Sequence, residues 1–311
     1  MRIIHVLSLF FMTFILGCST ASQESSSEGS TTTAYDPTLI DFSPYTENPV
    51  FGGTDSTHWD ERIRERGYIL KEGDTYHMWY TGYQEGAEKG MMLGYASSPD
   101  GLSWTRHPDN PIYTENWVED MMVIKQDSIY HMFAEGKNDI AHRLTSTDRI
   151  HWEEQGKLDI RYTNGEALSP GPFGTPTVWF EEDRWYLFYE REDTGIWLAT
   201  SEDLEVWTHV QDDPVLTMGP ESYDQYGLAV NQIVKKDGIY YAYYHGTELE
   251  DWSRWTTNLA TSEDLIHWKK YEQNPIMEDN KSSGLLVHDG QQYRLYTMHP
   301  EVHVHFPEEH P

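Results

Sequence analysis

The chain has 311 residues, of which 52 are acidic and 22 are basic, and its formal net charge at pH 7 is −30. A surface of this sign repels phosphate backbones, which argues against nucleic-acid binding as a function class. The single cysteine allows no internal disulfide, so stability must come from a core to which aromatic residues, 14% of the chain, can contribute.

The first residues have the pattern of an export signal. Arg2 precedes an apolar run over residues 3–16, shorter than the about 20 residues that a membrane-spanning helix needs. The following "ILGC" resembles the bacterial lipobox, whose cysteine carries the lipid. We therefore expect a signal peptide over residues 1–18, lipidation at Cys18, and a protein held in the bacterial cell envelope by that lipid alone. The alternative is an ordinary cleaved signal with an incidental cysteine.

Residues 19–44 are expected to form a flexible tether between the lipid and the folded domain. Their first part, "STASQESSSEGSTTTA", is rich in Ser, Thr, Glu and Gly and offers nothing apolar enough to pack.

A short motif, Ser-x-Asp-x-x-x-Trp, recurs four times in the rest of the chain. Its copies end at Trp104, Trp152, Trp207 and Trp268, so the spacings are 48, 55 and 61 residues. Repeats of about 40 to 50 residues built from short strands are typical of propeller blades. In each copy we expect Ser and Asp to make a tight turn and Trp to pack between adjacent blades.

An aromatic strand precedes every copy of the motif, and a fifth such strand stands alone. The strands span residues 75–83, 129–137, 184–192, 239–247 and 292–299. An Asn-Pro unit at 48–49 stands before any complete blade, so the N-terminal segment is expected to supply the outer strand that the fifth blade lacks. The sequence thus predicts an all-β domain over residues 45–311, a five-bladed β-propeller closed by strand exchange between its ends.

Positions at which the blades differ are the candidates for function, because the shared positions build the scaffold. The innermost strands and the ends of the second strands meet at one face around the central channel. The first residues of the innermost strands are Glu65-Arg66, Glu119-Asp120, Gly174-Thr175, Asn231-Gln232 and Ser282-Ser283. The second strands end in Tyr83, Glu135, Glu190-Arg191, His245 and His299.

This five-blade plan, with acidic residues opening inner strands, resembles the superfamily that contains glycoside hydrolase families 43, 32, 117 and 130. The repeat "YHMWYTG" followed by "GYASSPDGLSW" is especially similar to family 43-like proteins. The resemblance implies hydrolysis or phosphorolysis of glycosidic bonds by carboxylates from different blades, one protonating the leaving oxygen and one activating water or attacking carbon.

By analogy with family 43, Glu65 or Asp60 would supply the first-blade base and Asp120 or Glu119 the acid of the second blade. The fourth blade departs from that pattern because Asn231-Gln232 stands where an acid is expected, and blade one lacks the usual Asp-Pro. Candidates for the missing proton donor are Glu190, Glu135, His245 and His299, the histidines because imidazole titrates near neutrality.

Substrate contacts are expected from the remaining polar residues of the same face and from one aromatic ring. Trp59 precedes Asp60 and could stack on a sugar. The other expected substrate-binding residues are Arg66, Glu135, Thr175, Arg191, Asn231, Gln232, His245, Ser283 and His299.

No cofactor is expected, although His299, His303 and His305 leave room for a structural metal ion near the channel axis. The hydrogen-bonded alternative for these histidines is the commoner arrangement.

The sequence therefore predicts an exported, lipid-anchored glycoside hydrolase that acts on oligo- or polysaccharides in the central pocket. Two alternatives stay open. One is a non-catalytic glycan-binding surface lipoprotein, which the amides of the fourth blade favour. The other is a glycoside phosphorylase, which would need cations around a phosphate; Arg66, Arg191 and Lys281 are the obvious candidates.

Overall fold

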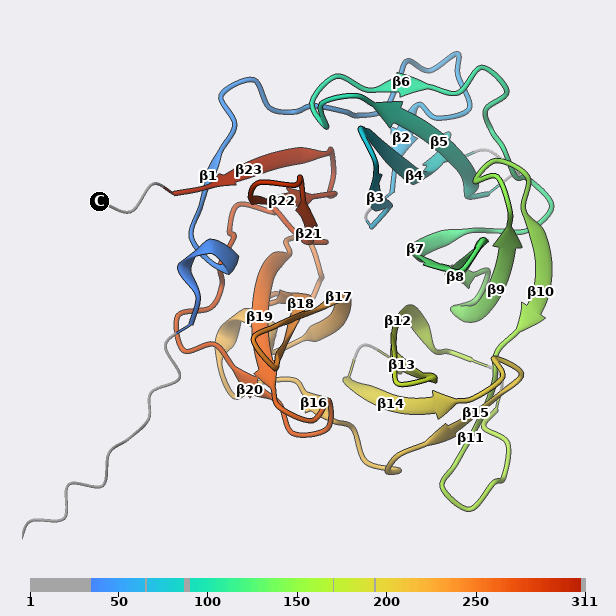
Figure 1. Ribbon diagram of the computed structural model, residues 1–311, viewed down its shortest axis with the longest axis vertical. Coiled ribbons are helices and arrows are strands. Elements are labelled where there is room, and N and C mark those ends of the chain that lie inside the picture. The colour runs from blue at the N-terminus through green and yellow to red at the C-terminus, as the bar shows by residue number, and fades with distance from the viewer. Residues whose placement is uncertain (1–34, 65, 87–89, 170, 193, 309–311) are drawn as a thin grey trace, which may run out of the picture. The chain divides into compact units, whose positions relative to one another are not determined.

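Five sheets, antiparallel except for one pair of strands, stand around one centre (Figure 1). The computed structural model describes residues 35–64, 66–86, 90–169, 171–192 and 194–308. Cys18, the signal peptide and Glu65 lie outside the described residues. The predicted all-β five-bladed propeller is confirmed.

Each blade is a meander, and the chain visits the blades in order. Blade 1 contains β3 (Tyr68–Glu72), β4 (Thr75–Tyr83), β5 (Met92–Ser98) and β6 (Thr105–Arg106), with β2 (Arg62–Ile63) on β4. Blade 2 contains β7 (Glu119–Gln126), β8 (Ile129–Gly136), β9 (Ile140–Ser146) and β10 (Glu153–Lys157). Blade 3 contains β12 (Gly174–Glu181), β13 (Arg184–Glu190), β14 (Gly195–Ser201) and β15 (Val206–His209), with β11 (Asp159–Arg161) on β15 and β16 (Leu216–Thr217) on β14. Blade 4 contains β17 (Gly227–Lys236), β18 (Ile239–Thr247), β19 (Thr256–Ser262) and β20 (Lys269–Lys270).

The fifth blade joins the two ends of the domain. It contains β21 (Leu285–His288), β22 (Tyr293–Thr297) and β23 (His303–Pro307), and its outer strand is β1 (Phe42–Pro44). Phe42 pairs with Pro307 across the junction, and Phe51 forms a further bridge to Val302. Strand exchange closes the ring as predicted and removes two open sheet edges.

The folded domain begins earlier than residue 45, the boundary that the sequence predicted. A short 3-10 helix, η1 (Pro37–Leu39), precedes β1, and Leu39 is fully buried. The Tyr243 hydroxyl donates a 2.6 Å hydrogen bond to the carbonyl oxygen of Leu39. Residues 35–44 therefore belong to the propeller and not to the tether, because Leu39 and Phe42 bury apolar surface that composition alone did not reveal.

The repeated motif has the structural role that the sequence predicted. In its first copy the Ser98 hydroxyl oxygen accepts the backbone N–H of Gly101, and Asp100 accepts the N–H groups of Leu102 and Ser103. The tryptophans of later copies pack edge-on against the aromatic strand of the preceding blade, as Trp207 does on Phe133. The pairs Trp152–Trp79 and Trp268–Phe188 repeat this contact between other blades.

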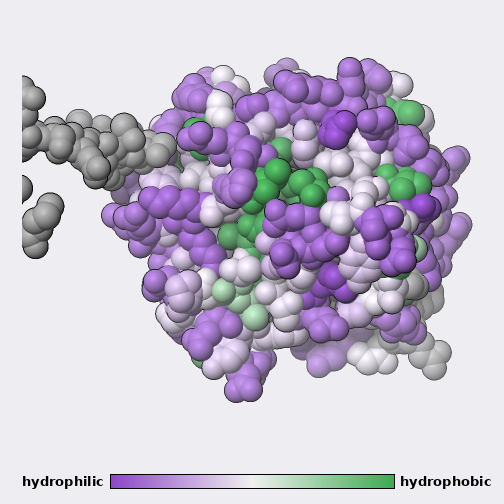
Figure 2. Space-filling model, turned by 90° about the horizontal axis from the view of Figure 1, so that it is seen from below, coloured by the Kyte–Doolittle hydropathy of each residue, from purple (hydrophilic) through white to green (hydrophobic). Residues whose placement is uncertain are grey.

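The surface is polar, as the charge and composition imply. Figure 2 shows one side of the molecule, where hydrophilic residues predominate and apolar ones gather in a few small areas. Within the described part of the chain, no helix has the length and apolar character to cross a membrane.

Candidate active site

Irregular pairing at the start of the inner strands aims side chains toward the channel mouth. On β7 the pair Glu119–Glu135 is followed by Met122–Phe133, so two residues of β7 stand opposite one residue of β8. A β-bulge of this kind bends the strand and redirects its side chains. Asp120 occupies the bulge with φ of 45°, a left-handed conformation that is uncommon outside glycine.

The same backbone feature recurs at the start of other inner strands. Thr175 lies in the bulge of β12 with φ of 46°, and Arg66 and Ser283 precede β3 and β21 with φ of 49° and 57°. The sequence alignment had placed all four residues at equivalent positions, and the backbone bears this out. Blade 4 differs, because its irregularity falls at Asn231 and not at Gln232, the residue that the alignment had placed with these four.

On the second strands, three side chains share one register. Glu135 pairs with Glu119, Glu190 with Gly174, and His245 with Ala229. The three are 9%, 5% and 7% exposed, so each is nearly withdrawn from solvent.

These bulge and second-strand residues line one pocket of about 470 Å³ at the channel mouth. Six of the predicted site residues face it, namely Asp120, Glu135, Thr175, Glu190, His245 and Ser283. The expected convergence of Asp120 and Glu190 on a common cavity is thus present. Its volume is in the range usual for small-molecule sites.

Two carboxyl groups crowd over the bulge of β12. The backbone N–H of Thr175 donates to Glu135 Oε2 at 3.0 Å, and that of Gly174 donates to Glu190 Oε1 at 2.9 Å. A Cβ atom at Gly174 would stand 2.0 Å from the first oxygen and 2.6 Å from the second. The two oxygens are therefore no further apart than the sum of those distances, and residue 174 has no room for a side chain.

Burial raises the pKa of Glu135 well above its usual value, and nearby carboxylates add to the effect. Burial is the largest cause, followed by the negative charges of Asp120 and Glu119, while Asp139 and Glu190 add to the effect. Desolvation and like charge both disfavour the ionised form. Glu135 therefore keeps its proton at pH values where an ordinary glutamate has lost it, the property required of a general acid.

Arg66 does not bind substrate as the sequence predicted, because it is completely buried beneath the pocket. Its guanidinium donates to the carbonyl oxygens of Asp120 at 2.7 Å and Pro176 at 2.9 Å, and to Thr177 Oγ1. Arg66 thus ties the inner strand of blade 1 to the bulges of blades 2 and 3. Its function is to position the backbone that carries Asp120.

Glu119 is occupied by two neighbours and does not line the pocket. It accepts a 3.0 Å hydrogen bond from Arg64 Nε and a 2.7 Å hydrogen bond from the Trp117 indole. Arg64 does line the pocket, and the ion pair with Glu119 offsets its charge.

Asp60 and Trp59, predicted for catalysis and sugar stacking, lie inside blade 1 instead. Asp60 is 1% exposed, pairs with Arg106 at 2.8 Å, and accepts a hydrogen bond from the Tyr80 hydroxyl. Burial alone would raise the pKa of Asp60, but these partners, with Thr54, lower it below the usual value. Trp59 stacks on Tyr80 at 5.8 Å.

The amides of blade 4 are structural as well. Asn231 is completely buried, and its amide lies 2.9 Å from His245 Nδ1, so it fixes the orientation of that imidazole. The Gln232 amide donates to the carbonyl oxygen of Leu286 and accepts its N–H, which joins blade 4 to blade 5.

Arg191 and His299, also predicted to bind substrate, are not among the described residues that line the pocket. The Arg191 guanidinium lies over the Trp197 ring, 5.2 Å from its centre. His303 and His305 lie on β23, where they contact Lys281 and Thr297 respectively. No group of three or more His, Cys, Asp or Glu side chains in the described ranges is arranged to hold a metal ion.

Sequence reasoning missed the aromatic wall of the pocket. Trp252 and Trp255 line it from the loop between β18 and β19, and the Trp255 ring lies edge-on to His245 at 4.9 Å. This loop belongs to no repeat unit, so the blade alignment gave no signal for it. The other unpredicted lining residues are Arg64, Asp139, Pro172 and Glu192, together with Ser282, which the sequence had only marked as a strand start.

Comparison with known proteins relates this geometry to carbohydrate-active enzymes. No family model matches the sequence. The chain is 24% identical over 259 residues to a 1,2-β-oligomannan phosphorylase of Thermoanaerobacter sp. (strain X514), over 77% of this chain and 83% of that protein.

Two solved structures have the same architecture at lower identity. β-1,2-Mannobiose phosphorylase from Listeria innocua, in complex with β-1,2-mannobiose, has a TM-score of 0.65 at 14% identity and covers 86% of this chain and 96% of its own. The second structure comes from work showing that the GH130 family of mannoside phosphorylases contains glycoside hydrolases that target β-1,2-mannosidic linkages in Candida mannan. It has a TM-score of 0.67 at 15% identity and covers 88% of this chain and 95% of its own. The particular likeness to family 43 stays a prediction. The domain is thus a five-bladed β-propeller of the kind found in family 130 glycosidases and mannoside phosphorylases.

Proposed function

We propose that this protein is a glycoside hydrolase that cleaves β-1,2-linked mannosides in the pocket at the channel mouth. The observation that carries the proposal is the convergence of Asp120, Glu135 and Glu190 in one pocket, where burial raises the pKa of Glu135. Hydrolysis of a glycosidic bond needs one carboxylic acid and one carboxylate at the same site. The sugar is proposed from the mannoside-active relatives.

In this mechanism Glu135 donates its proton to the glycosidic oxygen as the bond to the anomeric carbon breaks. A water molecule attacks that carbon, and Asp120 accepts the proton that the water gives up. Glu190 remains beside Glu135, where its negative charge favours the return of the proton after product release.

Hydrolysis is favoured over phosphorolysis by the charge of the pocket. Among its described lining residues, Asp120, Glu135, Asp139, Glu190 and Glu192 supply carboxyl groups, whereas Arg64 is the only arginine or lysine and already pairs with Glu119. A phosphate ion would stand among carboxylates with little compensating positive charge.

The test is product analysis with β-1,2-mannobiose in the presence and absence of inorganic phosphate. Hydrolysis yields mannose in both cases, and phosphorolysis yields mannose 1-phosphate only when phosphate is present. Glu135→Gln and Asp120→Asn should each abolish turnover while the fold, followed by circular dichroism, persists. Binding of the disaccharide without turnover by the wild type would instead indicate a glycan-binding protein.

We further propose that the domain is exported and anchored through lipid on Cys18. The lipobox-like "ILGC" and the Ser/Thr-rich residues that follow support this proposal. Metabolic labelling with a radioactive fatty acid should mark the wild type and not Cys18→Ala; equal labelling of both would contradict it.

A further inference from the structure

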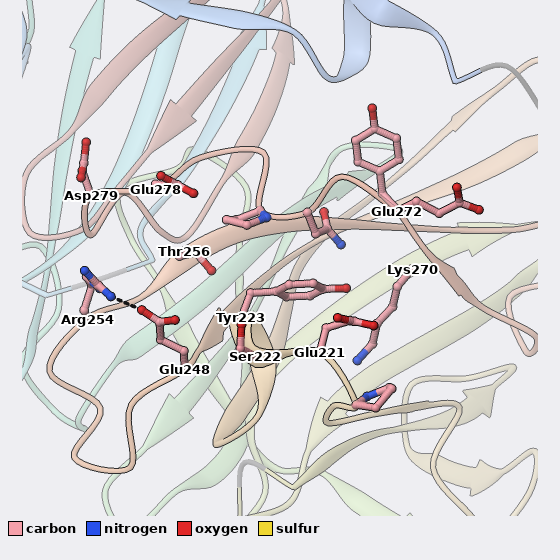
Figure 3. A pocket seen from close by; sticks show the side chains of 14 residues that line it. Glu221, Ser222, Tyr223, Glu248, Arg254, Thr256, Lys270, Glu272, Glu278 and Asp279 are labelled. Carbon is pink, nitrogen blue, oxygen red and sulfur yellow. Dashed lines mark hydrogen bonds and ion pairs between the residues drawn. The ribbon is translucent and has the colours of Figure 1, made fainter.

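A second and larger cavity, of about 730 Å³, lies at the outer part of blade 4. It opens at the same end of the propeller as the catalytic pocket. The helix η2 (Ser222–Asp224), which lines it, directly precedes β17, while Glu248 follows the end of β18 and Thr256 begins β19. We call it the rim cavity (Figure 3).

The rim cavity and the catalytic pocket share two stretches of chain as walls. In the loop between β18 and β19, Glu248 and Arg254 line the rim cavity, whereas Trp252 and Trp255 line the catalytic pocket. In the segment before β21, residues 278–279 line the first cavity and residues 282–283 the second. Only a few residues therefore separate the two spaces.

An exposed aromatic ring marks this boundary. Trp252 is 46% exposed, an unusual position for the largest apolar side chain. Its indole N–H donates to the carbonyl oxygen of Tyr226 at 3.0 Å, and its ring lies 6.1 Å from that of Trp255. A ring held in place in the catalytic pocket, on a loop whose other residues line the rim cavity, can support a ligand that extends from one cavity into the other.

Within the rim cavity, Tyr223 provides a second aromatic surface. Figure 3 shows its side chain extending across the middle of the cavity. The helix that carries it is firmly fixed, because the neighbouring Asp224 is completely buried and pairs with Lys270 at 2.5 Å. Asp224 also accepts the backbone N–H of Gly219 and the Tyr244 hydroxyl.

The charges of the rim cavity select for a neutral ligand. Its described lining includes carboxylates of Glu221, Glu248, Glu272, Glu278 and Asp279. The cations in that lining are Arg254 and Lys270, which pair with Glu248 and Asp224. An anionic sugar would meet uncompensated negative charge here, whereas the carboxylates can accept hydrogen bonds from the hydroxyl groups of a neutral one.

We infer that the catalytic pocket and the rim cavity form one groove that binds a neutral oligosaccharide longer than a disaccharide. The reacting bond lies over the carboxylates of the catalytic pocket, and further sugars cross Trp252 to reach Tyr223. This inference rests on the proposed hydrolase function and adds the length of its substrate.

The test compares kcat/KM for β-1,2-mannobiose and β-1,2-mannotetraose in the wild type, Tyr223→Ala and Tyr223→Phe. The wild type should prefer the tetrasaccharide. Tyr223→Ala should lower the ratio of the two constants about tenfold, the loss expected for one aromatic contact. Tyr223→Phe, which retains the ring, should keep the ratio of the wild type. Tyr226→Ala removes an exposed side chain that lines neither cavity and keeps the backbone carbonyl that holds Trp252, so it is the matched control.

Other results would refute either the extended groove, the role of Tyr223 or the hydrolase proposal. Hydrolysis without preference for the longer substrate, or an unchanged preference in Tyr223→Ala, refutes the extended groove and leaves the hydrolase intact. If the ratio of the two kcat/KM values falls in Tyr223→Phe and Tyr226→Ala as much as in Tyr223→Ala, the role of the Tyr223 ring is refuted. Absence of turnover at both lengths refutes the hydrolase proposal, and the extended groove with it.

Discussion

Gly174 should be important for activity although it has no side chain, because the two carboxyl groups lie against it. In Gly174→Ala the new methyl group would stand 2.0 Å from Glu135 Oε2 and 2.6 Å from Glu190 Oε1. Carbon and oxygen atoms that are not bonded rarely come closer than about 3 Å, so the Glu135 oxygen has to move by about 1 Å or more. A displacement of about 1 Å at a reacting group can reduce the rate about 100-fold.

The fold should survive this substitution, because the atoms that must move are the ends of two flexible side chains. Backbone φ at residue 174 is not in the left-handed region, so alanine meets no conformational penalty there. We therefore expect kcat/KM on β-1,2-mannobiose to fall about 100-fold, while the melting temperature changes little.

Gly195→Ala is the matched control for this experiment. Gly195 begins β14 in the same blade, and the nearest atom to its added Cβ would be a Pro214 carbon at 3.1 Å, away from the pocket. Both variants are assayed for kcat/KM and for thermal unfolding by circular dichroism. Wild-type activity in a folded Gly174→Ala protein would refute the assignment of the crowded carboxyl pair as the reacting groups.

Three further predictions concern charge. The pKa of Glu135 is higher in the folded chain than in the unfolded one. The free energy of unfolding should therefore fall as the pH rises from the ordinary pKa of glutamate to the raised pKa of Glu135. Urea titrations at several pH values should show this fall in the wild type and not in Glu135→Gln. In pH–rate profiles the alkaline limit of kcat/KM should move to lower pH in Glu190→Gln, which removes one of the charges that raise this pKa. An unmoved limit would contradict the effect of Glu190 on the acid. Asp60→Ala should destabilise the fold by about 3 kcal/mol, because it leaves Arg106 without its buried partner. It should change kcat of the folded enzyme little. A loss of kcat without a loss of stability would indicate that Asp60 takes part in catalysis.

The fold was predictable because its determinants are local and repeated. The Ser-x-Asp turn needs only hydrogen bonds within six residues, and the Trp that follows needs only the preceding blade to pack against. Strand exchange was predictable because the sequence has five aromatic strands but only four copies of the motif, so the fifth blade lacked an outer strand of its own. The start of the domain was missed because Leu39 and Phe42 are isolated apolar residues whose partners, such as Tyr243, lie far along the chain.

The site was predictable only in part, because charge alone does not show whether a residue has a partner. Asp60 and Arg66 belong to one dense charge cluster in the sequence, yet the structure gives both buried partners from distant segments. Asp60 pairs with Arg106, which is 46 positions away, and Arg66 binds backbone 54 and 110 positions away. No pattern in the sequence indicated either contact.

The register of the second strands explains why the pocket lies toward one side of the channel. The position of Glu135 is occupied in blade 1 by Thr81, which donates to the carbonyl oxygen of Val118, and in blade 5 by the buried Met298. Carboxylic acids at this position therefore occur only on the adjacent blades 2 and 3, and His245 follows on blade 4. Trp252 and Trp255 bound the pocket on blade 4, the side on which the rim cavity lies. If the proposed function holds, the asymmetry of this one strand position orients the reacting bond and directs the rest of the glycan across blade 4.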